Sequence, residues 1–160
     1  MLNFTDFYEN YALDVYRFVF WLARDEEEAE DITSETFVRA WVNHNNIRTE
    51  TLKAYLFTIA RNLFLEQRRK NRRQVMLEDS LPDTSPGPVK QVESLQKLQR
   101  IKQFLSVMKE PDKTAFILRV QHKLPYAEIA RVLGISLASA KVKVHRVRKK
   151  LLTEFHETEV

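Results

Sequence analysis

Basic side chains gather in two separate strips of this 160-residue sequence, and their chemistry suits phosphate binding. Arg61 to Arg73 holds six basic residues and one acid, and Lys141 to Lys150 holds six basic residues and no acid. Clusters of this kind are the usual electrostatic footprint of nucleic-acid-binding proteins. Either strip alone could be a solvated helix face, but one strip in each half of the chain favours nucleic-acid binding.

Other kinds of chemistry find little support. The four histidines form no paired metal-ligand motif such as HExxH, and no carboxylate pair stands beside a candidate nucleophile. Cysteine is absent, which excludes thiol nucleophiles and cysteine-based zinc sites, and the only glycines, Gly87 and Gly134, are too far apart for a glycine-rich phosphate loop. We therefore expect a protein that is not an enzyme and has no metal and no cofactor.

The sequence predicts an all-α protein with two small helical domains. Three of the five prolines and one of the two glycines lie between Pro82 and Pro88, a composition typical of a linker. The predicted domains are residues 1–74 and 93–160, joined by a flexible linker at 75–92. The longest apolar run, Phe18 to Ala23, is too short to insert in a membrane, and no secretory signal is visible, so we expect a cytoplasmic protein.

Apolar residues at spacings of three and four predict three helices in the first domain. The first runs from about Thr5 to Ala23. The second extends from an N-cap at Asp25, with Glu28 at the capping-box position, to about Val42. After a polar loop at 43–50, a third helix runs from about Thr51 to Arg73.

Four helices are predicted in the second domain. The first stops near Pro111, and the next is expected to be capped by Asp112 and to continue through Val120. A short helix at Tyr126–Leu133 and a last helix at Leu137–Phe155 complete the domain.

The last two helices have the form of a helix-turn-helix, with Gly134 at the turn and Ser136 as the second N-cap. An inward apolar stripe in the last helix leaves the other face to Ser139, Lys141, Val142, Lys143, His145, Arg146, Arg148 and Lys149. In a major groove, Arg146 could pair with guanine and Val142 could touch a thymine methyl group. The alternative is a basic surface helix without a nucleic-acid partner, but the turn glycine and the density of cations favour DNA binding.

The third predicted helix interleaves cations with aromatic residues. Arg61, Arg68 and Arg72 lie opposite its apolar stripe. Phe57 and Phe64 fall partly outside that stripe, and they could stack on unpaired bases or simply belong to the core. Similarly, Asn62 could hydrogen-bond a base edge or merely be solvated.

The second predicted helix carries an acidic outer face with exposed valines. Asp31, Ser34 and Glu35 lie beside Val38 and Val42, and the first 35 residues hold ten acids and two arginines, a net charge of −8. Exposed apolar residues flanked by acids can mark a protein-binding face, although single exposed valines are also common.

Taken together, several segments of the sequence resemble one family. AEDITSETFVRAW, LKAYLFTIARN, a proline-bearing linker, YAEIARVLGIS and KVHRVRKKL are similar, in this order, to the bacterial extracytoplasmic-function (ECF) sigma factors of RNA polymerase. The resemblance covers nearly the whole chain. It implies an alternative sigma factor that binds core polymerase and opens the −10 promoter element with its first domain, and reads the −35 element as duplex with its second.

The resemblance also implies roles for particular residues. Core-polymerase binding would fall to Asp31, Ser34, Glu35 and Val38. Capture of a flipped −10 base and binding of its strand would fall to Ile47, Arg61, Asn62, Arg68, Arg69 and Arg72. Reading of the −35 duplex would fall to Ser139, Lys141, Val142, His145, Arg146 and Lys149.

The implied partners are core RNA polymerase, through the clamp helices of its largest subunit and the flap of the second, promoter DNA, and an anti-sigma factor acting in trans. Two other readings remain open. A stand-alone helix-turn-helix regulator with a helical dimerisation or sensor domain would leave the Arg61–Arg73 strip without an evident use. A pure protein-interaction module would leave both basic strips idle.

Overall fold

The computed structural model describes residues 3–46, 52–77 and 93–156, and every regular element in those ranges is a helix. The elements are α1 (Phe4–Ala23), α2 (Glu26–Val42), the 3-10 helix η1 (His44–Asn46), α3 (Leu52–Leu77), α4 (Glu93–Ser106), α5 (Glu110–Val120), α6 (Tyr126–Leu133) and α7 (Leu137–His156). The predicted all-α class with two helical units is thereby confirmed. The proposed linker lies almost wholly outside the described residues.

Most of the predicted helix boundaries follow from visible caps. The Asp25 carboxylate accepts a hydrogen bond from the Glu28 backbone N–H at 3.0 Å, which satisfies one of the free donors at the start of α2. The Ser136 hydroxyl accepts a hydrogen bond from the backbone N–H of Ser139 at 3.1 Å at the start of α7. Gly134 ends α6 with φ +66°, the left-handed conformation that glycine adopts without steric cost.

Three boundary predictions were wrong. The helix expected to stop near Pro111 ends at Ser106. Asp112 is not an N-cap, because α5 begins at Glu110 after an N-cap at Lys109. Pro111 therefore lies inside the first turn, where its missing N–H costs nothing since that position has no helical acceptor. The third helix also continues past Arg73 to Leu77.

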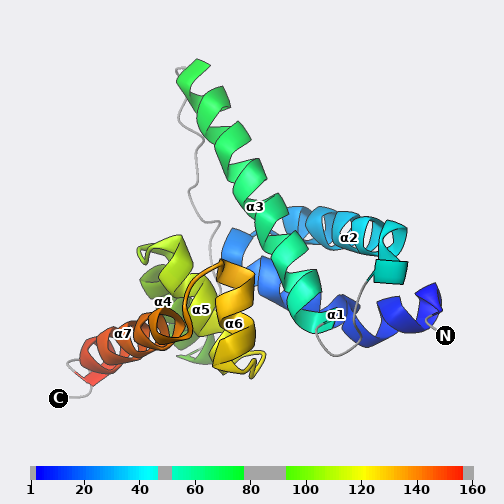
Figure 1. Ribbon diagram of the computed structural model, residues 1–160. Coiled ribbons are helices and arrows are strands. Elements are labelled where there is room, and N and C mark those ends of the chain that lie inside the picture. Colours follow the sequence, from blue (N-terminus) through cyan, green and yellow to red (C-terminus); the bar gives the residue numbers. More distant parts are fainter. Residues whose placement is uncertain (1–2, 47–51, 78–92, 157–160) are drawn as a thin grey trace.

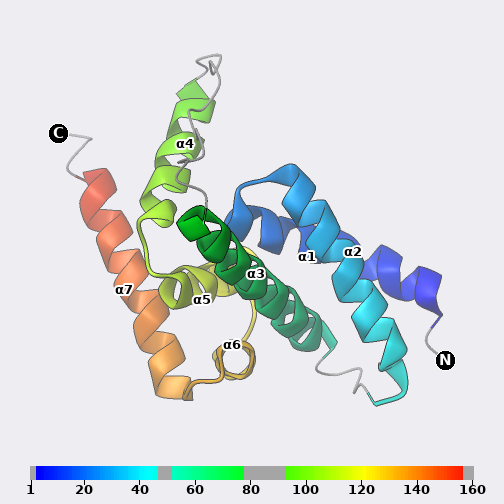
Figure 2. The ribbon, with the colours of Figure 1, turned by 90° about the horizontal axis from the view of Figure 1, so that it is seen from above.

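The N-terminal unit is a bundle of α1, α2 and α3 (Figure 2). Its centre is aromatic, since Phe18, Phe37 and Phe57 are almost completely buried. Thr33 and Thr36 are buried too, and their hydroxyls donate to the carbonyls one turn earlier, Ala29 and Ile32, at 2.6 Å. Both buried hydroxyls are thus satisfied within α2 itself.

The C-terminal unit packs α5, α6 and α7 around a second core (Figure 1). Leu118, Ile129, Val144 and Val147 are fully buried there. The turn after α5 is stabilised by Arg119, whose guanidinium donates to the Leu124 carbonyl at 3.1 Å and lies 4.2 Å from the centre of the Tyr126 ring. These contacts fix the angle at which α6 leaves α5, and so position α7.

The two units pack directly on each other. In Figures 1 and 2, α3 lies between α1 and α2 on one side and the C-terminal helices on the other, and α3 contacts α6 while α1 contacts α5. His122 is central to this interface, with its ring 4.8 Å from that of Phe57 and 6.1 Å from that of Phe18. Lys102 of α4 adds a cation–π contact, 5.1 Å from the centre of the Phe20 ring. The sequence pattern left this arrangement undetermined.

None of the described helices combines the length and the apolar character needed to cross a lipid bilayer.

The burial of His122 makes the stability of this closed arrangement depend on pH. Desolvation lowers the pKa of His122 from 6.5 to about 4; the smaller influences come from Asp14, which raises it, and from Lys53 and Arg17, which lower it. The folded form therefore binds fewer protons than the unfolded chain between these two pKa values. The contribution of neutral His122 to the free energy of unfolding is therefore fully present above pH 6.5, and it decreases as the pH falls toward 4.

We predict that wild-type protein loses about 2 kcal/mol of unfolding free energy between pH 7.5 and pH 5.0 through His122. A His122→Phe variant keeps an aromatic ring at the interface but has no titrating group there. Its loss of unfolding free energy over the same pH range should therefore be smaller than that of the wild type by about 2 kcal/mol. Urea unfolding at both pH values measures the difference. Equal losses in the two proteins would contradict this account, because their remaining histidines are shared.

Candidate protein and nucleic-acid interfaces

The outer face of α2 brings four predicted site residues together. Asp31, Ser34, Glu35 and Val38 are all exposed, and their spacing of three, four and seven residues places them on one side of the helix. Val38 is 55% exposed, so this face presents an apolar side chain to solvent beside two carboxylates. The pattern holds because the other side of α2 supplies the buried face of the bundle.

A groove between α2 and α3 extends this face. Its α2 side contains Asp31 and Glu35, with Arg39, whose guanidinium pairs with Glu35 at 3.0 Å. Its α3 side was missed by sequence reasoning and consists of Leu63, Glu66, Gln67 and Lys70. The sequence did contain a signal for them, because these four residues recur at spacings of three, four and seven and so lie on one side of α3. That side overlaps the edge of the apolar stripe, so it was read as part of the core. The groove combines the apolar side chains of Ile32 and Leu63 with three carboxylates, of which Glu35 pairs with Arg39 and Glu66 with Lys70. Such a mixed apolar and charged surface is suited to docking of a partner helix.

Two of the predicted DNA-binding arginines are occupied within the protein. Arg61 makes two hydrogen bonds to Glu110 of α5, from Nε to Oε1 at 2.7 Å and from Nη2 to Oε2 at 2.9 Å. Arg68 donates from Nη2 to the Ala23 carbonyl at 3.2 Å and to Glu28 Oε2 at 3.3 Å. Both guanidiniums therefore hold elements together in this structure.

The carboxylate of Glu28 does not complete the expected capping box, because it turns toward Arg68. Burial raises the pKa of Glu28, while the positive charge of Arg68 lowers it and Asp25 raises it. Its other oxygen, Oε1, is buried without a hydrogen-bond partner. Arg68 is thus the main compensation for a partly desolvated carboxylate, which gives this arginine a structural role.

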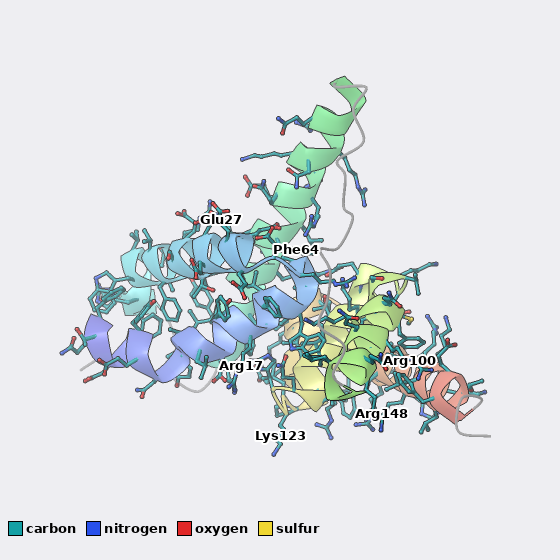
Figure 3. All side chains as sticks on the ribbon, turned by 180° about the vertical axis from the view of Figure 1, so that it is seen from behind. Arg17, Glu27, Phe64, Arg100, Lys123 and Arg148 are labelled. Atoms are coloured by element: carbon teal, nitrogen blue, oxygen red, sulfur yellow. The ribbon has the colours of Figure 1, made fainter. Side chains whose placement is uncertain are left out.

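The remaining predicted residues on α3 are open to solvent. Asn62, Arg69 and Arg72 are exposed, and Asn62 and Arg69 lie on nearly the same side because they are seven residues apart. In Figure 3 the end of α3 that lies farthest from Phe64 extends beyond the other helices, and its side chains point into open space. Ile47 lies outside the described residues.

Of the two readings that the sequence left open for Phe57 and Phe64, the structure confirms that both belong to the core rather than to a base-stacking surface. Phe57 is completely buried against Phe18 and His122, and Phe64 is only 4% exposed, with the Arg68 guanidinium 4.8 Å from the centre of its ring. The buried face of α3 is wider than that of a helix in an isolated three-helix bundle, because the C-terminal unit covers one of its flanks.

On α7 the predicted inward stripe is confirmed. Ala140, Val144 and Val147 are fully buried, and Leu151 is partly buried. The opposite side exposes Lys141, Val142, His145, Arg146 and Lys149, while Ser139 is half-buried near the turn. The −35 residues inferred from the resemblance therefore share one solvent-facing side of the helix.

Asp112 was missed as part of this surface. Its carboxylate is almost completely buried under α7, with Oδ1 3.5 Å from Lys143 Nζ and Oδ2 3.5 Å from Arg146 Nη1. Both are long ion-pair distances, so the carboxylate acts as a charge that orients two cations rather than as a tight hydrogen-bond partner. A second groove, between α4 and α7, contains Phe104, Arg146, Lys149, Lys150, Thr153 and Glu154.

In the part of the chain that the structure describes, no group of three or more histidine or acidic side chains is arranged to hold a metal ion.

These contacts separate two neighbouring arginines by role. We predict that Arg68→Ala lowers the free energy of unfolding by about 1–2 kcal/mol, because it removes two hydrogen bonds and a cation–π contact. The matched variant Arg69→Ala changes an exposed side chain with no partner in the structure and should alter stability by less than about 0.5 kcal/mol. Urea unfolding at pH 7.5 compares them. Equal stability of the two variants would show that the Arg68 contacts contribute nothing.

Comparisons with known proteins address the resemblance directly. Residues 7–74 match the family described as Sigma-70 region 2, and residues 98–151 match Sigma-70, region 4. The chain is 30% identical over 155 residues to the ECF RNA polymerase sigma factor SigM of Bacillus subtilis, covering 94% of this chain and 93% of that protein. It is 28% identical over 169 residues to SigW of the same organism, covering 96% and 89%.

The solved structure of the sigma factor RpoE of Bartonella quintana, in complex with the anti-sigma factor NepR, superposes with a TM-score of 0.78 at 26% identity, over 94% of both chains. That coverage includes both helical units. With both sigma regions in order and relatives matched along nearly their whole length, the chain belongs to the ECF family of RNA polymerase sigma factors and is an alternative sigma factor, a transcription initiation factor.

Proposed function

We propose that this sigma factor binds core RNA polymerase through the groove between α2 and α3 and reads the promoter at two separate places. The observation that supports it most is the outer face of α2, where Asp31 and Glu35 line the groove together with α3 and the exposed Val38 lies on the same side of the helix. The clamp helices of the largest polymerase subunit would lie there. The groove between α4 and α7, with Phe104 at its apolar part, would take the flap of the second subunit.

The proposed −10 site uses the exposed side of α3. Asn62 would hydrogen-bond an unpaired base, Ile47 would contribute to the same pocket, and Arg69 and Arg72 would follow the phosphates of the same strand. Flipping a base costs a few kcal/mol, which pocket contacts and phosphate pairing offset. Arg61 would join this site only after leaving Glu110, and Arg68 would act mainly by holding α3 against α1.

The proposed −35 site is the solvent-facing side of α7. Arg146 would read guanine through two hydrogen bonds, Val142 would touch a thymine methyl group, and Ser139 would contribute near the helix start. Lys141, His145 and Lys149 would contact phosphates or nearby base edges. Asp112 supports this arrangement from beneath, because its negative charge lies 3.5 Å from Lys143 and from Arg146 and attracts both side chains.

The proposed division into domains gives each half one task. Residues 1–74 would bind polymerase and the −10 element, residues 93–160 would bind the −35 element, and residues 75–92 would connect them. When both units are bound to one polymerase, each raises the local concentration of promoter DNA for the other, so two weak sites can act as one strong site.

We also propose that an anti-sigma factor regulates this protein in the cytoplasm. The support is the solved RpoE, which superposes along 94% of this chain while bound to the anti-sigma factor NepR. A shared arrangement of both units offers the same combination of surfaces to such a partner. The exposed carboxylates of α2 would then be covered in the inhibited complex.

Binding to sigma-free core RNA polymerase tests the proposed docking face. We predict tight binding by the wild type and at least a tenfold loss in the double variant Asp31→Arg/Glu35→Arg, since two attractive charges become repulsive. The control Glu26→Arg/Glu30→Arg makes the same charge change at the same spacing on another side of α2 and should bind nearly as well as the wild type. Surface-immobilised core polymerase gives both affinities.

A wild-type chain that fails to bind core polymerase but binds duplex DNA tightly would favour the stand-alone regulator instead. Equal losses in the two double variants would show that net charge matters and that the α2–α3 groove is not the docking face.

A further inference from the structure

The ion pair between Arg61 and Glu110 joins the two units by the strongest geometry available to these side chains. Two parallel hydrogen bonds, at 2.7 and 2.9 Å, connect the guanidinium of α3 to the carboxylate of α5. The side chains are only 13% and 21% exposed, so water screens the pair weakly. Thr114 donates to Glu110 Oε1 at 2.8 Å and holds the carboxylate in place.

Two further contacts belong to the same interface. Lys113, next to Thr114 on α5, is 8% exposed and donates to the Leu22 carbonyl near the end of α1 at 3.4 Å. Farther along, the ring of His122 fills the space beside Phe18 and Phe57. The interface thus has a polar part around Arg61 and an apolar part around His122, and both must separate if the units move apart.

With its two units packed on each other, a state called closed below, the protein is too short to contact both promoter elements at once. Promoter elements centred ten and thirty-five base pairs upstream lie ~25 base pairs apart, which is ~85 Å of duplex. A compact chain of this length has a radius of gyration of about 15 Å. The 15 residues 78–92 could reach up to about 50 Å when extended, so separation of α3 from α6 is compatible with the length of the chain.

We propose that the Arg61–Glu110 ion pair is an autoinhibitory latch: it holds the free sigma factor closed, and the Glu110 carboxylate occupies the guanidinium that a promoter phosphate would otherwise bind. The inference rests on the proposed −10 role of Arg61. A guanidinium pairs with carboxylate and phosphate through the same two-pronged geometry, so the two partners exclude each other. Glu110 has the advantage in the free chain because it is attached to the same molecule.

Assembly with core RNA polymerase must then open this latch. Polymerase contacts that pull the two units apart would break the ion pair and release Arg61 at the same time. Promoter binding would then retain the open state, because phosphate replaces the carboxylate on Arg61. Free sigma factor would bind promoter DNA weakly, because the closed arrangement does not reach both elements and because Arg61 is paired with Glu110.

The absence of native cysteine allows a direct test of closure. Glu9→Cys on α1 and Gln103→Cys on α4 place a dye pair on exposed positions of the two units. Single-molecule energy transfer then counts open molecules at pH 7.5. We expect Glu110→Gln to raise the ratio of open to closed molecules by about tenfold, since it leaves Arg61 without its charged partner. Arg61→Gln should do the same.

The matched control is Glu66→Gln, which removes an equal charge from an exposed ion pair with Lys70 on α3. It should leave the ratio of open to closed molecules unchanged. Circular dichroism at pH 7.5 establishes that each variant keeps its helices. Wild-type closure in both Glu110→Gln and Arg61→Gln would overturn the latch, whatever the role of Arg61 in DNA binding.

Masking of Arg61 is tested with fluorescein-labelled 20-nucleotide oligo-dT at low salt. We expect Glu110→Gln to bind several times more tightly than Glu66→Gln, and the double variant Arg61→Gln/Glu110→Gln to lose that gain. An open Glu110→Gln variant that binds no better than Glu66→Gln would overturn the masking and the DNA role of Arg61 together. The two measurements therefore separate failure of the latch from failure of the proposed −10 site.

Discussion

Burial of His122 between the two helical units is the constraint on which the rest of the structure depends. The ring lies beside Phe18 and Phe57 with Nε2 buried and unpaired, and its desolvation lowers its pKa and so favours the neutral imidazole. Because the loop after α5 carries this ring, the position of α6 and α7 relative to α3 follows from it. The same interface widens the buried face of α3 and contains the pair between Arg61 and Glu110. Packing of the two units therefore decides whether Arg61 is available to another partner.

The different sides of helix α3 have different roles. One side supplies core residues such as Phe57, and a second, with Leu63 and Gln67, completes the groove beside α2. A third pairs Arg61 with the C-terminal unit, and a fourth exposes Asn62. Such crowding explains why a substitution on this helix can disturb stability, domain closure or nucleic-acid binding, depending only on which side it changes. Neighbouring residues therefore differ sharply in role.

The spacing of residues along the chain predicted the helices and their caps well, but it did not predict contacts between residues far apart in the sequence. Caps such as Asp25 and Ser136, and the inward stripe of α7, depend on residues within one or two turns, so spacing alone identified them. The pairing of Arg61 with Glu110 joins residues 49 positions apart, and no periodicity contains it. Phe57 was ambiguous for the same reason: its partner His122 lies in the other unit, and a helix read alone shows only an over-wide apolar face.

Closure of the free sigma factor, and its opening on assembly with polymerase, would change which side chains solvent can reach. Hydroxyl-radical footprinting of the full chain, alone and bound to core RNA polymerase, measures this accessibility through the oxidation of individual side chains. The account predicts that His122 and Phe57 are protected in the free chain and become accessible in the complex, while Phe37 and Leu118, inside each unit, stay protected in both. Equal protection of His122 in the free and bound states would contradict it.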